Sequence, residues 1–408
     1  MTSKINTSKQ FWLPVFFAFV LFFTFPATLP AQEHAIHDEH DTLIQTAEGV
    51  EDINAHPETK KEKMDITAVA FEHILDSHSW HLWGEGHDAV AISLPVILKG
   101  RNGISCFLSS EFHHDVHGTK VVEKNGERFV NFEDKIYYAS ETANGNGEFL
   151  ELKENEKGEV EVLNEAPLDF SITKNVTQLF ISVIVLVLLF SSVAKSYKKH
   201  GVTSAPKGKQ SFLEPLIIFV RDDIAKDNIG RTYERFVPYL LSVFFLILLN
   251  NVFGLIPIGA NLTGNIAFTL VLSAFTLIIT NINGNKNYWS HIFLPHAPKA
   301  IWPILIPIEI VGILTKPFAL MIRLFANMSA GHIIVISLIG LIFVFKTLFI
   351  SPVSVAFALF IDVLECLVAF LQAYIFTMLT ALFIGSAVAE HHEEEHGHGD
   401  EHVAEAKH

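Results

Sequence analysis

The sequence predicts an all-α polytopic membrane protein with five membrane-crossing helices and a small, β-rich extension at its N-terminal end. Half of the 408 residues are hydrophobic, and several apolar runs approach the roughly 20 residues that a helix needs to cross the bilayer core. One such run, residues 174–194, is followed at once by a cluster of lysines, as at a cytoplasmic membrane surface. A third observation is Arg323, which lies in an apolar stretch and indicates a function inside the membrane.

The N-terminal residues 1–31 have the pattern of a secretory signal peptide. Lys4 and Lys9 precede an apolar run over residues 11–25, and small residues and prolines lead to Ala31. A retained membrane anchor is the alternative, because Leu29 fits a cleavage site poorly. In both cases we expect the chain after residue 31 to lie outside the cytoplasm.

Residues 32–170 are expected to form an exported, acidic and histidine-bearing extension that is partly β. Its acidic residues and those of the C-terminal tail account for much of the net charge of -15, so the membrane part itself is not acidic. Glycine- and asparagine-containing turn signals separate three predicted strands, namely residues 90–98, 104–112 and 128–138. Cys106 and Cys366 lie in different predicted environments, so no internal disulfide framework is expected.

The membrane domain is expected over residues 171–390, with its first span ending in the cytoplasm. A charged amphipathic segment follows and is predicted to lie on the cytoplasmic surface, since it is too charged to cross. The last two apolar stretches each hold over 40 residues, or more than about 60 Å of helix, so we expect one strongly tilted antiparallel hairpin with kinks at Pro307 and Pro317. The segment bounds are 174–194, 212–228 (surface helix), 236–256, 266–282, 300–345 and 348–389.

The tail over residues 391–408 is rich in histidine and acidic residues and is predicted to be solvated in the cytoplasm. Metal binding by this tail is the less favoured alternative. The sequence predicts no cofactor and no metal site elsewhere.

A guanidinium at mid-bilayer costs at least about 2.5 to 3.5 kcal/mol, so Arg323 needs a reason to be there. If the hairpin turn is centred near residue 349, His332 faces Glu365 and Asn327 faces Gln372, with Arg323 within one turn of Gln372. The four polar residues then line one side of the hairpin. Polar pairs that only hold the two helices together are the alternative interpretation.

Glu309, Lys316 and Arg323 are spaced by seven residues, so an unkinked helix presents them on one stripe. Glu309 then approaches Arg323 from the cytoplasmic side, while His332 and Glu365 approach it from the exported side. This layout is expected for two offset proton half-channels that a fixed positive charge separates.

The residues around Arg323 resemble the signature of the a subunit of the membrane sector of bacterial F-type ATP synthases. The resemblance rests on PFALMIRLFANMSAGH at residues 317–332 and covers about residues 174–390. Further matches follow in the same order as in that family: FVRDDIA at 219–225, the segments at 237–239 and 254–257, TGN at 263–265 and LQAYIF at 371–376.

The resemblance implies a non-catalytic stator subunit in the bacterial inner membrane. It implies that Arg323 faces a carboxylate of the c-subunit ring, that Asn327, His332, Glu365 and Gln372 form the exported-side channel, and that Glu309 is the cytoplasmic-side acid. Other implied partners are the b subunits of the peripheral stalk, the F1 sector and membrane lipids, with no nucleic acid. The sequence lacks a GxxxxGK[ST] phosphate loop.

Three alternatives stay open at this point. A Na⁺-coupled version of the same subunit uses the same residues, because the c ring chiefly decides which ion is carried. A stand-alone proton channel or transporter predicts inverted repeats, which the sequence does not display. A secreted metal-binding module on a membrane anchor explains the histidines but leaves Arg323 unexplained.

Overall fold

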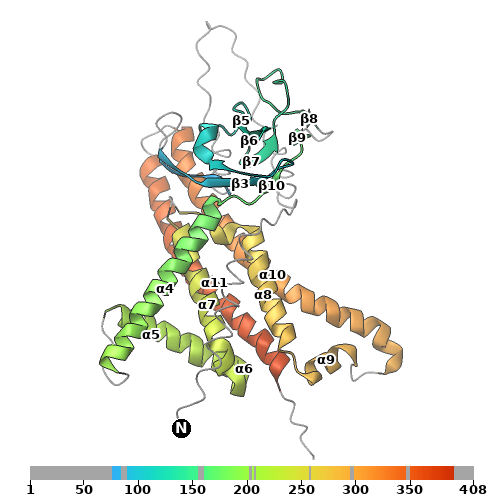
Figure 1. The fold of residues 1–408 in the computed structure, drawn as a ribbon. Helices are drawn as coiled ribbons and strands as arrows, with labels where there is room; N and C mark the ends of the chain where they lie inside the picture. The colour runs from blue at the N-terminus through green and yellow to red at the C-terminus, as the bar shows by residue number, and fades with distance from the viewer. Residues whose placement is uncertain are drawn as a thin grey trace, which may run out of the picture.

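The computed structural model describes residues 76–83, 90–154, 160–201, 205, 208–256, 259–294, 298–345 and 350–389. The predicted signal peptide, residues 32–75 and the tail over residues 391–408 lie outside the described residues. The described chain has two parts: a small β-domain, and a bundle of long helices that begins at α4 (Figure 1).

The β-domain is built from short antiparallel strands because glycine, asparagine and acidic residues turn the chain every few residues. Strand β1 (Ser79–Trp83) pairs with β2 (Val90–Ser93), and β8 (Leu152–Glu154) pairs with β9 (Val160–Val162). One three-stranded sheet has the order β10 (Leu168–Asp169), β3 (Pro95–Lys99), β4 (Ile104–Leu108), and another has the order β5 (Val122–Lys124), β6 (Glu127–Phe132), β7 (Lys135–Tyr138). Their inner faces share a core that includes Leu98, Phe107 and Phe129.

The three predicted strands were too long. Residues 90–98 divide into β2 and β3 at Leu94, and residues 104–112 end in a 3-10 turn over Ser109–Phe112. Residues 128–138 form a hairpin, since Glu133 (φ 48°) and Asp134 (φ 61°) adopt the left-handed conformation of a two-residue turn.

The helical part has the order that the apolar runs predict. Its main helices are α4 (Lys174–His200), α7 (Tyr233–Gly254), α8 (Ile266–Ile282), α10 (Trp302–Phe345) and α11 (Ile350–Val388). Buried side chains of α7, including Phe236, Leu240 and Phe244, lie at the centre of its core. Both prolines that were expected to kink the helix, Pro307 and Pro317, lie inside α10.

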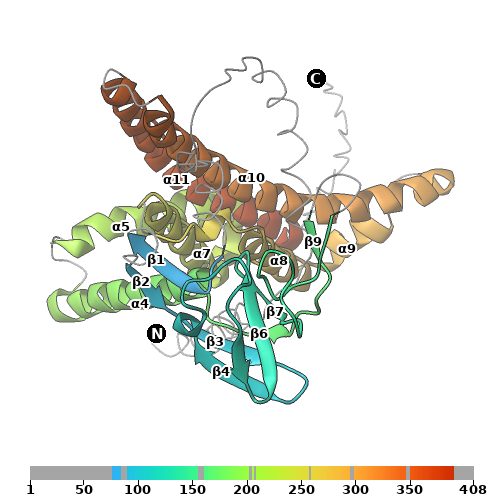
Figure 2. The same ribbon diagram turned by 90° about the horizontal axis from the view of Figure 1, so that it is seen from above.

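Four described helices are long and apolar enough to cross a membrane. A fifth span is counted if α8 is joined with α9 (Lys286–Phe293), which follows it after a bend of 102°. This agrees with the predicted polytopic all-α architecture, although α9 was expected to be loop. Helices α10 and α11 run side by side as the predicted hairpin (Figures 1 and 2).

The predicted surface helix forms as α5 (Lys209–Phe219), a π-helical segment over Val220–Lys226 and α6 (Asp227–Ile229). Val220, Ile224 and Ala225 are buried, and this segment packs on α7 and α11. Gly385 of α11 lies so close that an added Cβ would meet the Asn228 carbonyl oxygen at 1.9 Å. The charged segment is therefore fixed to the end of the hairpin.

Candidate functional site

Arg323 lies on the outer face of α10. Leu320 and Leu324, one on each side of it, are 2% and 1% exposed and pack into the helical core. Arg323 itself is exposed, and so are Ala319 and Ala326, which lie one helical turn before and after it on the same face. The structure gives it no hydrogen bond or ion pair with any described residue. A guanidinium on a face that lies in hydrocarbon is costly without a counter-charge.

Glu365 of α11 lies against α10 at the position that the hairpin geometry predicts. A Cβ added to Gly331 would stand 2.6 Å from Glu365 Oε1, so the carboxylate rests on the backbone next to His332. Both Glu365 and His332 are half-buried. The absence of a side chain at Gly331 thus makes room for the carboxylate at the helix interface.

Glu365 Oε1 is buried without a hydrogen-bond partner among the described residues. Asp362, which the sequence analysis did not single out, lies one helical turn before Glu365 and is also half-buried. Two acidic groups and a histidine therefore occupy one part of the hairpin.

Gln372 and Asn327 lie in different environments. Gln372 is 4% exposed within the helix bundle, whereas Asn327 is exposed on the outer face with Arg323. The structure shows no hydrogen bond between these two side chains. A molecule that contacts Arg323 can therefore also contact Asn327. The side chain of Gln372 instead lies inside the helix bundle.

Buried asparagines outside the hairpin were missed by the sequence analysis. Asn251 of α7 donates from Nδ2 to the Ala369 carbonyl oxygen (3.0 Å), one turn before Gln372. The 3-10 helix η6 (Leu262–Gly264) contacts α10, where the Ser329 hydroxyl donates to the Gly264 carbonyl oxygen (3.3 Å). These contacts extend the polar surroundings of the hairpin to α7 and to the loop before α8.

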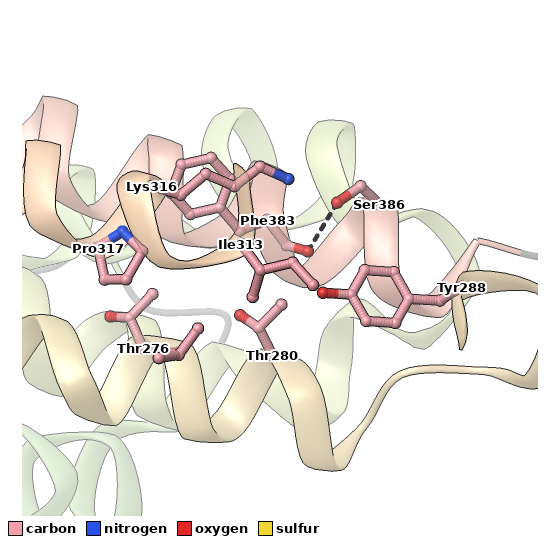
Figure 3. A pocket seen from close by; sticks show the side chains of 9 residues that line it. Thr276, Thr280, Tyr288, Ile313, Lys316, Pro317, Phe383 and Ser386 are labelled. Atoms are coloured by element: carbon pink, nitrogen blue, oxygen red, sulfur yellow. Dashed lines mark hydrogen bonds between the residues drawn. The ribbon is translucent and has the colours of Figure 1, made fainter. Parts of the chain in front are cut away.

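Residues of α10 before Arg323 border a small pocket between α8, α9, α10 and α11 (Figure 3). Lys316 reaches across it, with Nζ 5.4 Å from the centre of the Phe383 ring. Hydroxyl groups of α8, α9 and α11 also line the pocket, those of Thr276, Thr280, Tyr288 and Ser386. The Thr280 hydroxyl has no hydrogen-bond partner among the described residues.

Glu309 lies two turns before Lys316 on α10, is half-buried and is close enough to Tyr288 to interact with it electrostatically. Lys316 is exposed, as is Arg323, and its contact with Phe383 directs it toward α11. Glu309 and Lys316 thus precede Arg323 on α10, and His332 follows it.

Comparison with known proteins identifies the family of this chain. The pattern of the family described as ATP synthase A chain matches residues 176–385, which includes every candidate site residue. A second family pattern, described as a domain of unknown function, matches residues 69–170, the region of the β-domain.

Similar proteins come from several bacteria. ATP synthase subunit a of Chloroherpeton thalassium is 52% identical over 240 residues, which are 57% of this chain and 72% of that protein. ATP synthase subunit a 2 of Chlorobaculum tepidum is 50% identical over 258 residues, 62% of this chain and 72% of that protein. The family pattern spans about half of this chain and the relatives are covered over most of their length, so the chain belongs to the ATP synthase A chain family.

Proposed function

We propose that Arg323 performs the central task of this proton-translocating stator subunit by separating two aqueous half-channels and facing the rotor. The observation that carries the proposal is the exposure of Arg323 on the outer face of α10, without a partner among the described residues. A carboxylate on each passing c subunit supplies the missing counter-charge. Because a guanidinium does not lose its proton, the site keeps its charge at every stage of rotation.

The exported-side half-channel is proposed to run past His332 and Glu365 to Asn327 and Gln372. The contact of Glu365 with the Gly331 backbone and its unpartnered buried oxygen, within the described chain, support a hydrated acidic site there. A proton that arrives at this site can neutralise a rotor carboxylate. The neutral carboxyl group then turns into lipid at much lower cost than the charged one.

The second half-channel is proposed to follow the pocket that Lys316 and Tyr288 line, with Glu309 at its cytoplasmic side. The hydroxyl groups of α8 and α11 in this pocket supply hydrogen-bond partners for water (Figure 3). A rotor carboxyl group that has turned through almost a full circle loses its proton here, since nearby Arg323 favours the ionised form.

The driving force in this scheme is the transmembrane potential together with the proton gradient. A potential of 100 mV contributes roughly 2.3 kcal/mol per charge, so several protons must pass for each ATP made. The nucleotide chemistry is assigned to other subunits of the ATP synthase complex, since this sequence has no phosphate-binding loop. We propose that the stator role also includes contacts with b subunits and, through them, with the F1 sector.

The rotor contact can be tested by crosslinking on α10. Ala319, exposed and one helical turn before Arg323, is changed to cysteine, and the matched control is a cysteine in place of Leu320, which is 2% exposed. We expect crosslinks to a cysteine on the outer helix of the c subunit for position 319 and none for position 320. Crosslinks to lipid-facing reagents alone at position 319 would contradict the proposed rotor face.

The proposed topology places residues 32–170 outside the cell and residues 391–408 in the cytoplasm, with residues 171–390 in the membrane and the signal peptide, residues 1–31, at the start. The lysines after the first span support this orientation. Protease added to intact spheroplasts is expected to cut before Thr173 and to spare an epitope tag placed after His408. Cleavage of the tag with protection of the β-domain would invert the orientation.

A further inference from the structure

Five polar side chains near the start of α4, the end of α7 and the following loop are buried and incompletely bonded. Each residue is at most 4% exposed. Within the described chain, these atoms have no hydrogen-bond partner: Asn175 Nδ2, Gln178 Nε2, Asn251 Oδ1, Asn261 Nδ2 and Thr263 Oγ1. Buried polar atoms without a protein partner are normally bonded to ordered water, and lipid offers no substitute. This concentration of unpartnered atoms indicates a hydrated region inside the bundle.

The polar residues of α4 form a row along one face. Asn175, Gln178 and Ser182 are spaced by three and four residues, which places them above one another on a helix. Residues on the other side of α4, such as Ile184 (57% exposed) and Leu188 (64% exposed), are apolar and face outward. The polar row is therefore turned toward α7 and η6, both of which α4 contacts.

At its inner end, the row connects to the hairpin. The Ser182 hydroxyl is 2.7 Å from Asn250 Oδ1, and the next residue, Asn251, donates to the Ala369 carbonyl oxygen of α11 (3.0 Å). Gln372 follows one turn later on the same helix. Two adjacent buried asparagines of α7 therefore contact α4 on one side and α11 on the other.

At its outer end, the row meets a carboxylate from the β-domain. Asp76 Oδ2 accepts from the Thr173 hydroxyl (2.9 Å) and Asp76 Oδ1 accepts from the Asn175 backbone N–H (3.0 Å). Figure 1 shows the start of α4 directly beneath the β-domain. Asp76 therefore stands at the junction between that domain and the polar row.

The charged surroundings of Asp76 suit a group that exchanges protons. Lys174 and His78 lie near it, and His78 Nε2 is 2.7 Å from Asp169 Oδ2, so charges of both signs surround the junction. Asp76 is partly exposed as a residue, but its carboxylate lies in the packed interior. This burial raises the pKa of the carboxyl group, although the hydrogen bonds from Asn175 and Thr173 act to lower it. A raised pKa brings proton uptake closer to neutral pH.

We propose that the α4 row, defined as Asn175, Gln178 and Ser182, lines a hydrated proton inlet that begins at Asp76 of the β-domain and ends at the hairpin. The proposal rests on the exported-side half-channel described above and deepens it. It gives the N-terminal domain a task, since the domain contributes the outermost proton-accepting group. The competing explanation is that these polar groups only fasten the β-domain to α4.

Silver ion accessibility in the assembled complex separates the two explanations. Cys106 and Cys366, both free, are first replaced by serine. Cysteine is then placed at Gln178 or Ser182, with Ile184→Cys on the lipid-facing side of α4 as the matched control. Ag⁺ reacts with the thiolate, and an apolar environment raises the pKa of a thiol, so that each unit of increase lowers the thiolate fraction tenfold. We therefore expect Ag⁺ to inhibit proton pumping at least about tenfold faster at positions 178 and 182 than at position 184. Equal rates at all three positions would overturn the inlet.

Passive proton conduction through membranes stripped of F1 provides the second measurement. Gln178→Leu and Asp76→Asn are expected to reduce proton conduction about tenfold, because the loss of one hydrogen-bonding group raises the barrier to proton movement. Gln178→Asn keeps an amide group and is expected to retain most of the conduction. Ser182→Ala is compared with Ser191→Ala, whose side chain is exposed on the same helix. Rotor subunits that co-purify with each variant report on assembly.

The outcomes distinguish the inlet from the proposed function. Full conduction in the Asp76 and Gln178 variants, with loss of conduction when His332 or Glu365 is changed, would overturn the inlet and leave the half-channel intact. Full conduction in all of these variants would remove the half-channel as well. If Gln178→Leu fails to assemble, the cysteine at Ser182 still decides, because serine and cysteine are nearly the same size.

Discussion

Replacing Arg323 with alanine is expected to reduce proton-driven ATP synthesis to background while the complex still assembles. The guanidinium lies on an exposed face and makes no hydrogen bond or ion pair within the described chain, so its loss removes no internal contact of the fold. What it does remove is the fixed charge that favours the ionised rotor carboxylate and repels protons between the two half-channels. Synthesis is measured in inverted membrane vesicles, together with the amount of rotor that co-purifies.

Two further variants sharpen the Arg323 experiment. Arg323→Lys keeps the charge but loses the planar fork that pairs with a carboxylate, so synthesis is expected to stay well below that of the unaltered complex. Arg231→Ala changes an exposed arginine in the turn before α7 and is expected to leave synthesis unchanged. ATP synthesis that persists in Arg323→Ala at the level of the Arg231→Ala control would refute the assigned role.

Sequence patterns located most helices because apolar length and capping residues are local properties. Helix α8 has the same bounds as the predicted span, residues 266–282. Asn265 caps its start, because its Oδ1 accepts hydrogen bonds from the backbone N–H groups of Ala267 and Phe268. The first span was predicted to end at Ala194, and the helix α4 that contains it continues to His200. The reason is that an apolar run marks the part of a helix in hydrocarbon, whereas lysines continue the same helix into water.

The features that the sequence did not predict depend on neighbours that are distant in the chain. The hairpin at Glu133 and Asp134 lacks the glycine that normally signals such a turn, although both residues adopt positive φ. Helix α9 is short and was taken for loop, but Asn285, just before it, is fixed by a hydrogen bond from its N–H to the Ala387 carbonyl oxygen of α11 (2.8 Å). Local propensity contains no information about that contact.

The same distinction applies to the candidate site. Arg323, His332 and Glu365 attract attention in the sequence because they are costly residues within apolar runs. Asn251 does not, since an asparagine near the end of a helix is ordinary, and its bond to the Ala369 carbonyl oxygen joins residues 118 positions apart. Asp76 is even less visible, because its contacts with Thr173 and Asn175 appear only when the β-domain is placed on α4.

Exchanging His332 and Glu365 is expected to restore much of the activity that either single change removes. The Glu365 carboxylate lies against Gly331, so the side chain at position 365 is next to the backbone that carries His332. His332→Glu alone brings several carboxylates together with Asp362 nearby, and Glu365→His alone leaves no carboxylate at position 365. Each single variant is expected to slow ATP synthesis at least about tenfold, which corresponds to roughly 1.4 kcal/mol in the barrier.

In the double variant, one acid and one imidazole again share the site, with their positions reversed. Residues in contact show coupling energies of about 0.5 to 3 kcal/mol in double-mutant cycles, so we expect the double variant to be clearly faster than the product of the two single effects predicts. A matched control combines His332→Glu with Asp362→His, which places the imidazole one turn away on the same helix. The pairing is refuted if the control variant recovers as much ATP synthesis as the exchange at position 365, or if the effects of the two single changes simply add in the double variant. In either case only general electrostatics would connect His332 and Glu365.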